Sequence, residues 1–156
     1  MIKLILTDVD GVLTDGFIHI GQEGELFKSF NVKDGTIVKQ AQERGIVVGI
    51  ITGRKSEITI RRAEELSILE VHQGVEDKLL IAKKLCLKYG VALRNVAFIG
   101  DDLPDIELLK SVGFSGSPAD AVDEVKNIVS FVSSFDSGKG AFRQFVEEIM
   151  SFELNK

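Results

Sequence analysis

Short, nearly continuous apolar runs alternate along this chain with longer segments of helical periodicity. The apolar runs fall at residues 2–6, 46–51, 96–99, 112–115 and 128–132, and the helical segments fall at 34–44, 57–66, 76–89 and 103–110. Strands that are apolar on both faces belong in the middle of a parallel sheet that helices cover on both sides. The alternation therefore predicts a three-layer, Rossmann-like α/β fold with a parallel sheet between two layers of helices.

Residues 17–30 interrupt this alternation. They read FIHIGQEGELFKSF, in which two short apolar stretches flank the turn signal GQEG. This pattern predicts an inserted β-hairpin, which is too small to form a domain of its own. At 156 residues, the chain has the length of one ordinary domain with one core.

The composition limits the classes of partner that we expect. The formal net charge is -5, which argues against nucleic acid or an anionic membrane as the main partner. An anionic ligand would then need a local positive site, such as a metal ion. The N-terminus lacks the features of a signal peptide, so we expect a cytoplasmic protein. Cys86 is the only cysteine, and we expect it to be a buried, reduced thiol.

Two aspartates follow the first apolar run, in the sequence IKLILTDVDG. Asp8 and Asp10 point the same way if the extended backbone continues as far as these residues. Two adjacent carboxylates repel each other, so the pair favours a bound cation or separate acid and base roles. Gly11 allows a sharp turn beyond them. A capping role for Asp8 would explain one acid but not the pair.

The next strand-like run leads into the sequence ITGRKSE. Here the Thr52 hydroxyl and the backbone at Gly53 precede a predicted helix, a position that suits an anion such as phosphate. Arg54 adds a charged group. A helix-capping role for Thr52 explains the same residues equally well.

An acidic cluster follows the run VAFI, in the sequence GDDLPD. Pro104 and one acid suit the first turn of a helix, so one of Asp101, Asp102 and Asp105 can be structural. Three carboxylates together favour Mg²⁺, which binds oxygen ligands and substrate phosphates. Lys78 lies near the start of a predicted helix, where a cation opposes the helix dipole. A solvated surface position is the alternative for this lysine.

These four groups of residues all fall at the carboxyl ends of predicted strands or at helix starts that face those ends. Open α/β sheets bind ligands at this edge. An ionised aspartate there can act as a nucleophile. Thr52, Lys78 and Mg²⁺ would neutralise phosphoryl oxygens, which is most of what a protein contributes to phosphoryl transfer.

The motifs DVDGVLTDG, ITGR, Lys78 and GDDLPD resemble, in order, the four signatures of the haloacid dehalogenase superfamily of phosphatases. The hairpin, FNVKDG, ITGRKS and the tail GKGAFRQF are similar to its small members, the 3-deoxy-D-manno-octulosonate 8-phosphate phosphatases. The resemblance implies one domain over residues 1–156 without a cap domain. It also implies Mg²⁺-dependent hydrolysis of a sugar-acid phosphate in lipopolysaccharide precursor synthesis.

The resemblance implies roles for the acidic residues. Asp8 would attack the phosphorus and form an aspartyl-phosphate, and Asp10 would protonate the leaving oxygen and then activate water. Mg²⁺ would be held by Asp8, by the backbone carbonyl of Asp10 and by Asp101. Asp102 and Asp105 would support the ion or its waters.

The resemblance also implies contacts with the substrate and between subunits. The residues expected to bind the substrate are Thr52, Lys78, Gly53, Arg54, Lys139 and Arg143. Thr52 and Lys78 would hold the phosphoryl group. The apolar residues of the hairpin would assemble a homotetramer, because an isolated hairpin cannot bury them. The glycine-rich tail would then close over an active site of the same or a neighbouring subunit.

Three positions depart from the pattern of the resembling phosphatases. Ser137 and Gln144 replace a Gly and a Glu in the tail, and Ile37 stands where a Gly is common. These changes leave the catalytic residues in place, but they affect which substrate we expect. A nine-carbon, sialic-acid-type 9-phosphate is therefore the alternative substrate.

The same residues distinguish such an enzyme from three non-enzymatic alternatives. A phospho-accepting receiver domain has its acidic pair after the first strand and its acceptor after a later one, which differs from the order here. An assembly domain of the same superfamily is disfavoured because every catalytic position is occupied. A calcium-binding EF-hand loop is excluded, since Val12 and His19 stand at ligand positions.

Overall fold

A computed structural model describes residues 1–154 of the chain, with the side chains of residues 1–151. Its main element is a six-stranded sheet in the order β5-β4-β1-β6-β7-β8, in which every pair of neighbouring strands is parallel. The strands are β1 (Leu4–Thr7), β4 (Val47–Ile51), β5 (Glu70–His72), β6 (Val96–Ile99), β7 (Phe114–Ser117) and β8 (Phe131–Val132).

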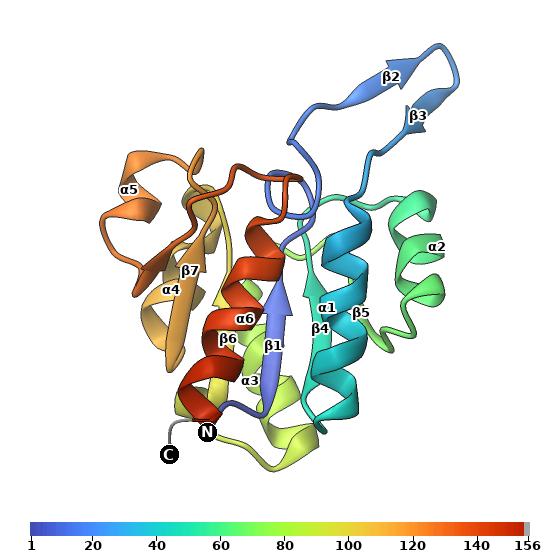
Figure 1. Ribbon diagram of the computed structural model, residues 1–156. Coiled ribbons are helices and arrows are strands. Elements are labelled where there is room, and N and C mark those ends of the chain that lie inside the picture. Colours follow the sequence, from blue (N-terminus) through green and yellow to red (C-terminus); the bar gives the residue numbers. More distant parts are fainter. Residues whose placement is uncertain (155–156) are drawn as a thin grey trace.

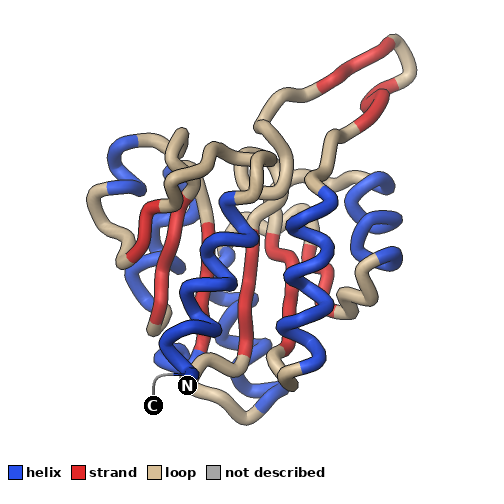
Figure 2. The backbone as a smooth tube through the Cα atoms, viewed as in Figure 1, coloured by secondary structure: helices blue, strands red, loops and turns tan. Residues whose placement is uncertain are grey.

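Helices cover both faces of this sheet (Figures 1 and 2). They are α1 (Val32–Glu43), α2 (Glu57–Glu65), α3 (Lys78–Tyr89), α4 (Ile106–Ser111), α5 (Asp123–Lys126) and α6 (Ala141–Leu154). Helices α1 and α6 lie side by side on one face, and α3 and α4 lie on the other. The predicted three-layer α/β fold is confirmed.

The central strand β1 shows why the apolar runs are continuous. Leu4 and Leu6 pack in the core on the side of α3 and α4, whereas Ile5 packs in the core on the side of α1 and α6. Successive side chains of a strand point to opposite faces, so a strand between two layers of helices needs apolar residues throughout. The neighbouring strand β6 follows the same rule, with Phe98 in the first core and Ile99 in the second.

Several predicted boundaries were wrong. The strand expected at 112–115 begins at Phe114, and the run at 128–132 contributes only the two residues of β8. The segment 103–110 divides into a 3₁₀ turn, Leu103–Asp105, and the short helix α4. Strand β5 and helix α5 were not predicted, because three or four residues are too few to show a period.

The predicted hairpin is confirmed as β2 (His19–Gly21) and β3 (Gly24–Phe27), which pair antiparallel. It projects from the body of the molecule at the end where β1 finishes (Figure 1). The large apolar side chains exposed on it are Phe17, Ile20, Leu26 and Phe27. The hairpin therefore carries apolar surface that this chain does not bury.

Two further expectations concern single features. Cys86 is a free, buried cysteine, as expected, and burial raises the pKa of its thiol. Within residues 1–154, none of the helices has the length and apolar character needed to span a membrane.

Candidate active site

The order of the strands creates a natural binding position beside β1. From β1 the chain builds β4 and β5 on one side and then crosses to β6 on the other. Ligands of open α/β sheets bind where the order reverses, outside the carboxyl ends of the strands. Asp8 follows β1 at this position, and Asp101 lies just beyond the end of β6.

A cleft of about 470 Å³ lies at this position. The residues that line it are Asp8, Asp10, Thr52, Gly53, Arg54, Val75, Glu76, Lys78, Asp101, Asp102, Pro104 and Asp105. The cleft brings together every predicted site residue from the four motifs. The two predicted tail residues, Lys139 and Arg143, are not among the residues that line it.

The ammonium group of Lys78 pairs with two carboxylates of the cleft. It is the first residue of α3, and the preceding Asp77 caps the helix by accepting a hydrogen bond from the Leu80 N–H. The Lys78 ammonium lies 3.0 Å from Asp8 Oδ2 and 2.5 Å from Asp105 Oδ1, with only 4% of its side chain exposed. The alternative of a solvated surface lysine is wrong.

The cleft perturbs the ionisation of its charged groups. Burial raises the pKa of Asp8 to about 6, with Lys78 opposing the rise and Asp105 adding to it. Burial and the neighbouring charges of Asp8, Asp105 and Asp102 raise the pKa of Asp101 to about 8. Burial lowers the pKa of Lys78, but the attraction of Asp8 and Asp105 is larger in sum and leaves that pKa above its ordinary value. The carboxylates of Asp8, Asp101 and Asp105 thus outnumber the Lys78 ammonium that lies beside them, and this favours a further positive ion.

The donor set fits Mg²⁺. Carboxylate oxygens of Asp8, Asp101 and Asp105 lie within 4.8 Å of one another, and Mg²⁺ binds oxygen ligands. Asp105 is fully buried and already accepts hydrogen bonds from the N–H groups of Asp101 and Asp102 as well as from Lys78. Its geometry therefore suits a supporting residue that fixes the Asp101 loop. Asp8 and Asp101 supply the other carboxylates of the group.

Gly11 lets the backbone pass close to Asp101. A Cβ atom at this position would lie 2.0 Å from Asp101 Oδ2, and the backbone φ of +87° is one that other residues rarely adopt. The glycine is therefore needed both for the turn and for the approach of the two loops.

The predicted cause of the convergence of Asp8 and Asp10, an extended backbone as far as Asp10, is wrong. Strand β1 ends at Thr7, and the Val9 carbonyl accepts hydrogen bonds from the N–H groups of residues 12, 13 and 14. The chain therefore turns here, and the alternation of an extended strand does not reach Asp10. Both side chains still line the cleft.

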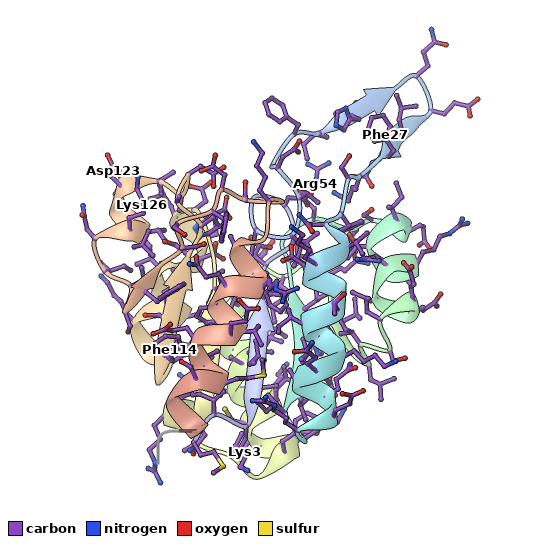
Figure 3. The ribbon with its side chains drawn as sticks, in the orientation of Figure 1. Lys3, Phe27, Arg54, Phe114, Asp123 and Lys126 are labelled. Atoms are coloured by element: carbon purple, nitrogen blue, oxygen red, sulfur yellow. The ribbon has the colours of Figure 1, made fainter. Side chains whose placement is uncertain are left out.

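Asp10 has partners that the sequence did not indicate. Its Oδ1 atom lies 2.5 Å from the Nζ atom of Lys28, which follows the hairpin strand β3. Its Oδ2 atom lies 4.0 Å from Nε of Arg54. Figure 3 shows Arg54 where the hairpin joins the body, with Phe27 further out on the hairpin.

Thr52 and Gly53 belong to a loop and not to a helix cap. Helix α2 begins at Glu57, and its cap is Ser56, whose hydroxyl accepts a hydrogen bond from the Thr59 N–H. The capping alternative for Thr52 is therefore wrong. Thr52 is buried at the wall of the cleft, where its N–H donates to the His72 carbonyl.

The tail lies close to the loop that follows β1. The N–H of Gly138 donates to the Val12 carbonyl at 3.0 Å, and the N–H of Arg143 donates to the Asp34 carboxylate at 3.0 Å. The Arg143 side chain pairs with Glu147 on its own helix, at 2.7 Å. A substrate-binding role for Lys139 and Arg143 stays a prediction.

Comparison with known proteins identifies the family. A model of haloacid dehalogenase-like hydrolases matches residues 65–144. The 3-deoxy-D-manno-octulosonate 8-phosphate phosphatase KdsC of Salmonella typhi is 39% identical over 149 residues, which are 96% of this chain and 79% of that protein. The KdsC phosphatase of Haemophilus influenzae is 41% identical and is covered to 83% of its length.

A solved structure agrees with the sequence matches. The 3-deoxy-D-manno-octulosonate 8-phosphate phosphatase of Moraxella catarrhalis, in complex with a magnesium ion, a phosphate ion and a KDO molecule, aligns with a TM-score of 0.93 and 39% identity. The alignment covers 96% of this chain and 86% of that one. The chain therefore belongs to the haloacid dehalogenase-like hydrolases.

Proposed function

We propose that this protein is a Mg²⁺-dependent phosphatase that hydrolyses 3-deoxy-D-manno-octulosonate 8-phosphate. The observation that carries the proposal is the convergence of Asp8, Asp10, Lys78 and Asp101 in one cleft at the reversal point of the sheet. The similarity to phosphatases of this name extends over 96% of the chain and supports the substrate.

Asp8 is the proposed nucleophile. Its Oδ1 atom accepts a hydrogen bond from the Val9 N–H at 2.7 Å, and its Oδ2 atom pairs with Lys78. With a pKa of about 6, the carboxylate is mostly ionised at neutral pH. It attacks the phosphorus, and the bond from phosphorus to the sugar oxygen breaks, which leaves an aspartyl-phosphate.

Asp10 is the proposed acid and base. It donates a proton to the sugar oxygen as that oxygen leaves, and the sugar acid departs as an alcohol. The resulting carboxylate then takes a proton from a water molecule that attacks the phosphorus of the aspartyl-phosphate. The acyl–phosphate bond breaks, inorganic phosphate forms, and the carboxylate of Asp8 is restored.

The remaining groups of the cleft stabilise charge. When bound, Mg²⁺ supplies positive charge that offsets the phosphoryl oxygens. Asp8, Asp101 and the backbone carbonyl of Asp10 would hold it, with Asp102 and Asp105 in support. Thr52 and Lys78 are proposed to bind the phosphoryl group, which a buried ammonium stabilises more strongly than an exposed one.

The substrate beyond the phosphate would meet Gly53 and Arg54 at the margin of the cleft. The Arg54 side chain is half-exposed and suits the carboxylate of a sugar acid, because a guanidinium can donate two parallel hydrogen bonds to it. A nine-carbon 9-phosphate has the same acid group at a greater distance from its phosphate. It is the alternative substrate.

We also propose a single domain without a cap and a homotetrameric assembly. The cleft has to exclude bulk water while the acyl-phosphate exists. The exposed apolar side chains of the hairpin support a contact with a neighbouring subunit. The tail, with Lys139 and Arg143, would then close over the cleft of its own or a neighbouring subunit.

The test of the proposed substrate is phosphate release from a panel of phosphate esters with Mg²⁺. The panel contains the octulosonate 8-phosphate, a nine-carbon 9-phosphate, a hexose 6-phosphate, a nucleotide and a phosphopeptide. We expect the highest kcat/KM for the octulosonate 8-phosphate and little release without Mg²⁺. A preference for the nucleotide or the phosphopeptide would contradict the proposal.

A further inference from the structure

Lys28 pairs with Asp10, a residue that lines the cleft, and comes from a part of the chain that none of the four motifs includes. It follows strand β3 at the base of the hairpin, and only 2% of its side chain is exposed. Its ammonium lies 2.5 Å from Asp10 Oδ1 and 3.1 Å from Glu25 Oε2. A lysine at the end of a surface hairpin is ordinarily solvated, so this burial between two carboxylates needs an explanation.

Glu25 anchors the lysine. Its carboxylate accepts a hydrogen bond from the hydroxyl of Ser56, the residue that caps helix α2. Burial raises the pKa of Glu25, but the hydrogen bonds from Ser56 and Lys28 outweigh that effect and hold the pKa below its ordinary value. The Ser56 N–H in turn donates to the side-chain carbonyl of Gln73 at 2.9 Å. A connected series of polar contacts therefore fixes Lys28 with respect to the body of the domain.

Asp10 needs such a fixed partner. It lies in the turn after β1, and a second charged group near its carboxylate, Arg54, is 4.0 Å away and half-exposed. A general acid has to stay within hydrogen-bond reach of the atom that it protonates. A carboxylate that is held at one oxygen keeps its other oxygen in a defined place for this purpose.

We propose that Lys28 is a positioning residue for Asp10: it holds Oδ1 and so aims Oδ2 at the leaving oxygen of the substrate. The hairpin thereby serves the chemistry of its own chain, in addition to any contact with a neighbour. This inference rests on the proposed role of Asp10 as general acid. The bland alternative is that Lys28 only docks the hairpin on the domain.

The two explanations differ in their dependence on the leaving group. A sugar oxygen leaves poorly unless it is protonated, whereas p-nitrophenolate leaves without a proton. The ratio kcat/KM reports the steps up to release of the leaving group, so it is insensitive to the later hydrolysis of the aspartyl-phosphate. We therefore compare kcat/KM on the octulosonate 8-phosphate and on p-nitrophenyl phosphate, with Mg²⁺ saturating.

For Lys28→Met we expect kcat/KM on the sugar phosphate to fall by about 10- to 100-fold, since general acid catalysis contributes about 10²–10⁴-fold. On p-nitrophenyl phosphate it should change little. Lys28→Arg should restore most of the loss, and Glu25→Gln should give a smaller loss with the same selectivity. Lys83→Met, at an exposed position of α3, is the matched control and should behave as wild type.

Asp10→Asn separates the inference from the proposal on which it rests. It should show the same selectivity for the sugar phosphate, and the double variant with Lys28→Met should lose no more than Asp10→Asn alone. If Asp10→Asn affects both substrates equally, the proposed role of Asp10 is wrong. If Asp10→Asn is selective but Lys28→Met affects both substrates equally, or neither, Lys28 has only a structural role and the inference is overturned.

Discussion

Two buried carboxylates share the ammonium of Lys78. Asp8 approaches it from the end of β1 and Asp105 from the 3₁₀ turn before α4, and all three side chains are largely withdrawn from water. Taking charges out of water is costly, and the cost is offset only while the partners stay together. Removal of one partner leaves the others uncompensated, so the stability of the metal-free protein depends on this lysine.

Lys78→Met tests this dependence. Without the ammonium, Asp8 and Asp105 repel each other or take up a proton, and we expect a loss of about 3–5 kcal/mol in the free energy of unfolding. For a domain of this size the loss corresponds to a fall in Tm of roughly 10 °C. Calorimetry in Mg²⁺-free buffer measures it, with Lys83→Met as the control. An unchanged Tm would mean that the buried ion pairs do not contribute to stability.

The sequence identified most of these residues but few of their partners. Asp8, Asp10 and the acidic cluster were predicted because residues at the carboxyl ends of parallel strands meet at one edge. Lys28 was missed, since it shows only as one lysine at the end of a hairpin strand. Its partner Asp10 is 18 positions away. A contact between side chains that are distant in the sequence produces no periodic pattern of apolar residues, so the sequence alone does not reveal it.

Among the elements, α1 and α6 are joined by a buried carboxylate. Asp34, in the first turn of α1, accepts a hydrogen bond from the Arg143 N–H at the start of α6. Its other oxygen has no hydrogen-bond partner within the described residues. Burial raises the pKa of Asp34 to about 6, although the Arg143 N–H and the charge of Arg62 act in the opposite direction.

This raised pKa predicts a pH-dependent stability. The folded state holds the Asp34 proton more tightly than the unfolded chain, where aspartate titrates near pH 3.9. Stability from the protonated form is therefore full below about pH 4 and is lost as the pH rises through 6. The loss is at most about 3 kcal/mol, because one pKa unit corresponds to 1.36 kcal/mol.

Asp34→Asn, which cannot titrate, isolates this effect. The free energy of unfolding of wild type, relative to the variant, should fall between pH 4 and pH 7. Urea unfolding of both proteins at several pH values in Mg²⁺-free buffer provides the measurement. A difference that stays constant over this range would contradict the expectation.

Elements with a long period were predicted, and short polar ones were not. The central strands and the helices α1, α2 and α3 follow from their apolar patterns. Strand β5 was missed because it begins with Glu70 and ends with His72, which look like loop residues. The charge of Glu70 is tolerated at this buried position because Lys88 and Tyr89, at the end of α3, donate hydrogen bonds to it. The hydrogen bonds that offset a buried charge in this way can be identified only from the packed structure.

At the scale of the whole molecule, the hairpin is the feature that the single chain does not explain. Ile20 and Leu26 are 69% and 63% exposed on it, next to Phe17 and Phe27. Several large apolar side chains exposed on one small element are typical of a contact between proteins. The proposed tetramer would bury it.

The double variant Ile20→Ser/Leu26→Ser tests the assembly. We expect its mass in solution to fall toward that of the monomer, as measured by light scattering after size-exclusion chromatography. The circular dichroism spectrum should be retained, because both side chains are exposed in the single chain. Leu87→Ser, at a site 84% exposed on α3, should leave the mass unchanged. If the mass of the double variant is unchanged, the hairpin does not form the interface between subunits.

In the proposed mechanism, Asp8 attacks the phosphorus and carries the phosphoryl group. Acid quenching during turnover of the ³²P-labelled octulosonate 8-phosphate with Mg²⁺ measures this directly. We expect a hydroxylamine-sensitive label on the peptide that contains Asp8 in the wild-type protein. No label should form in Asp8→Asn. Label on a different residue, or phosphate release by Asp8→Asn at the wild-type rate, would contradict the account.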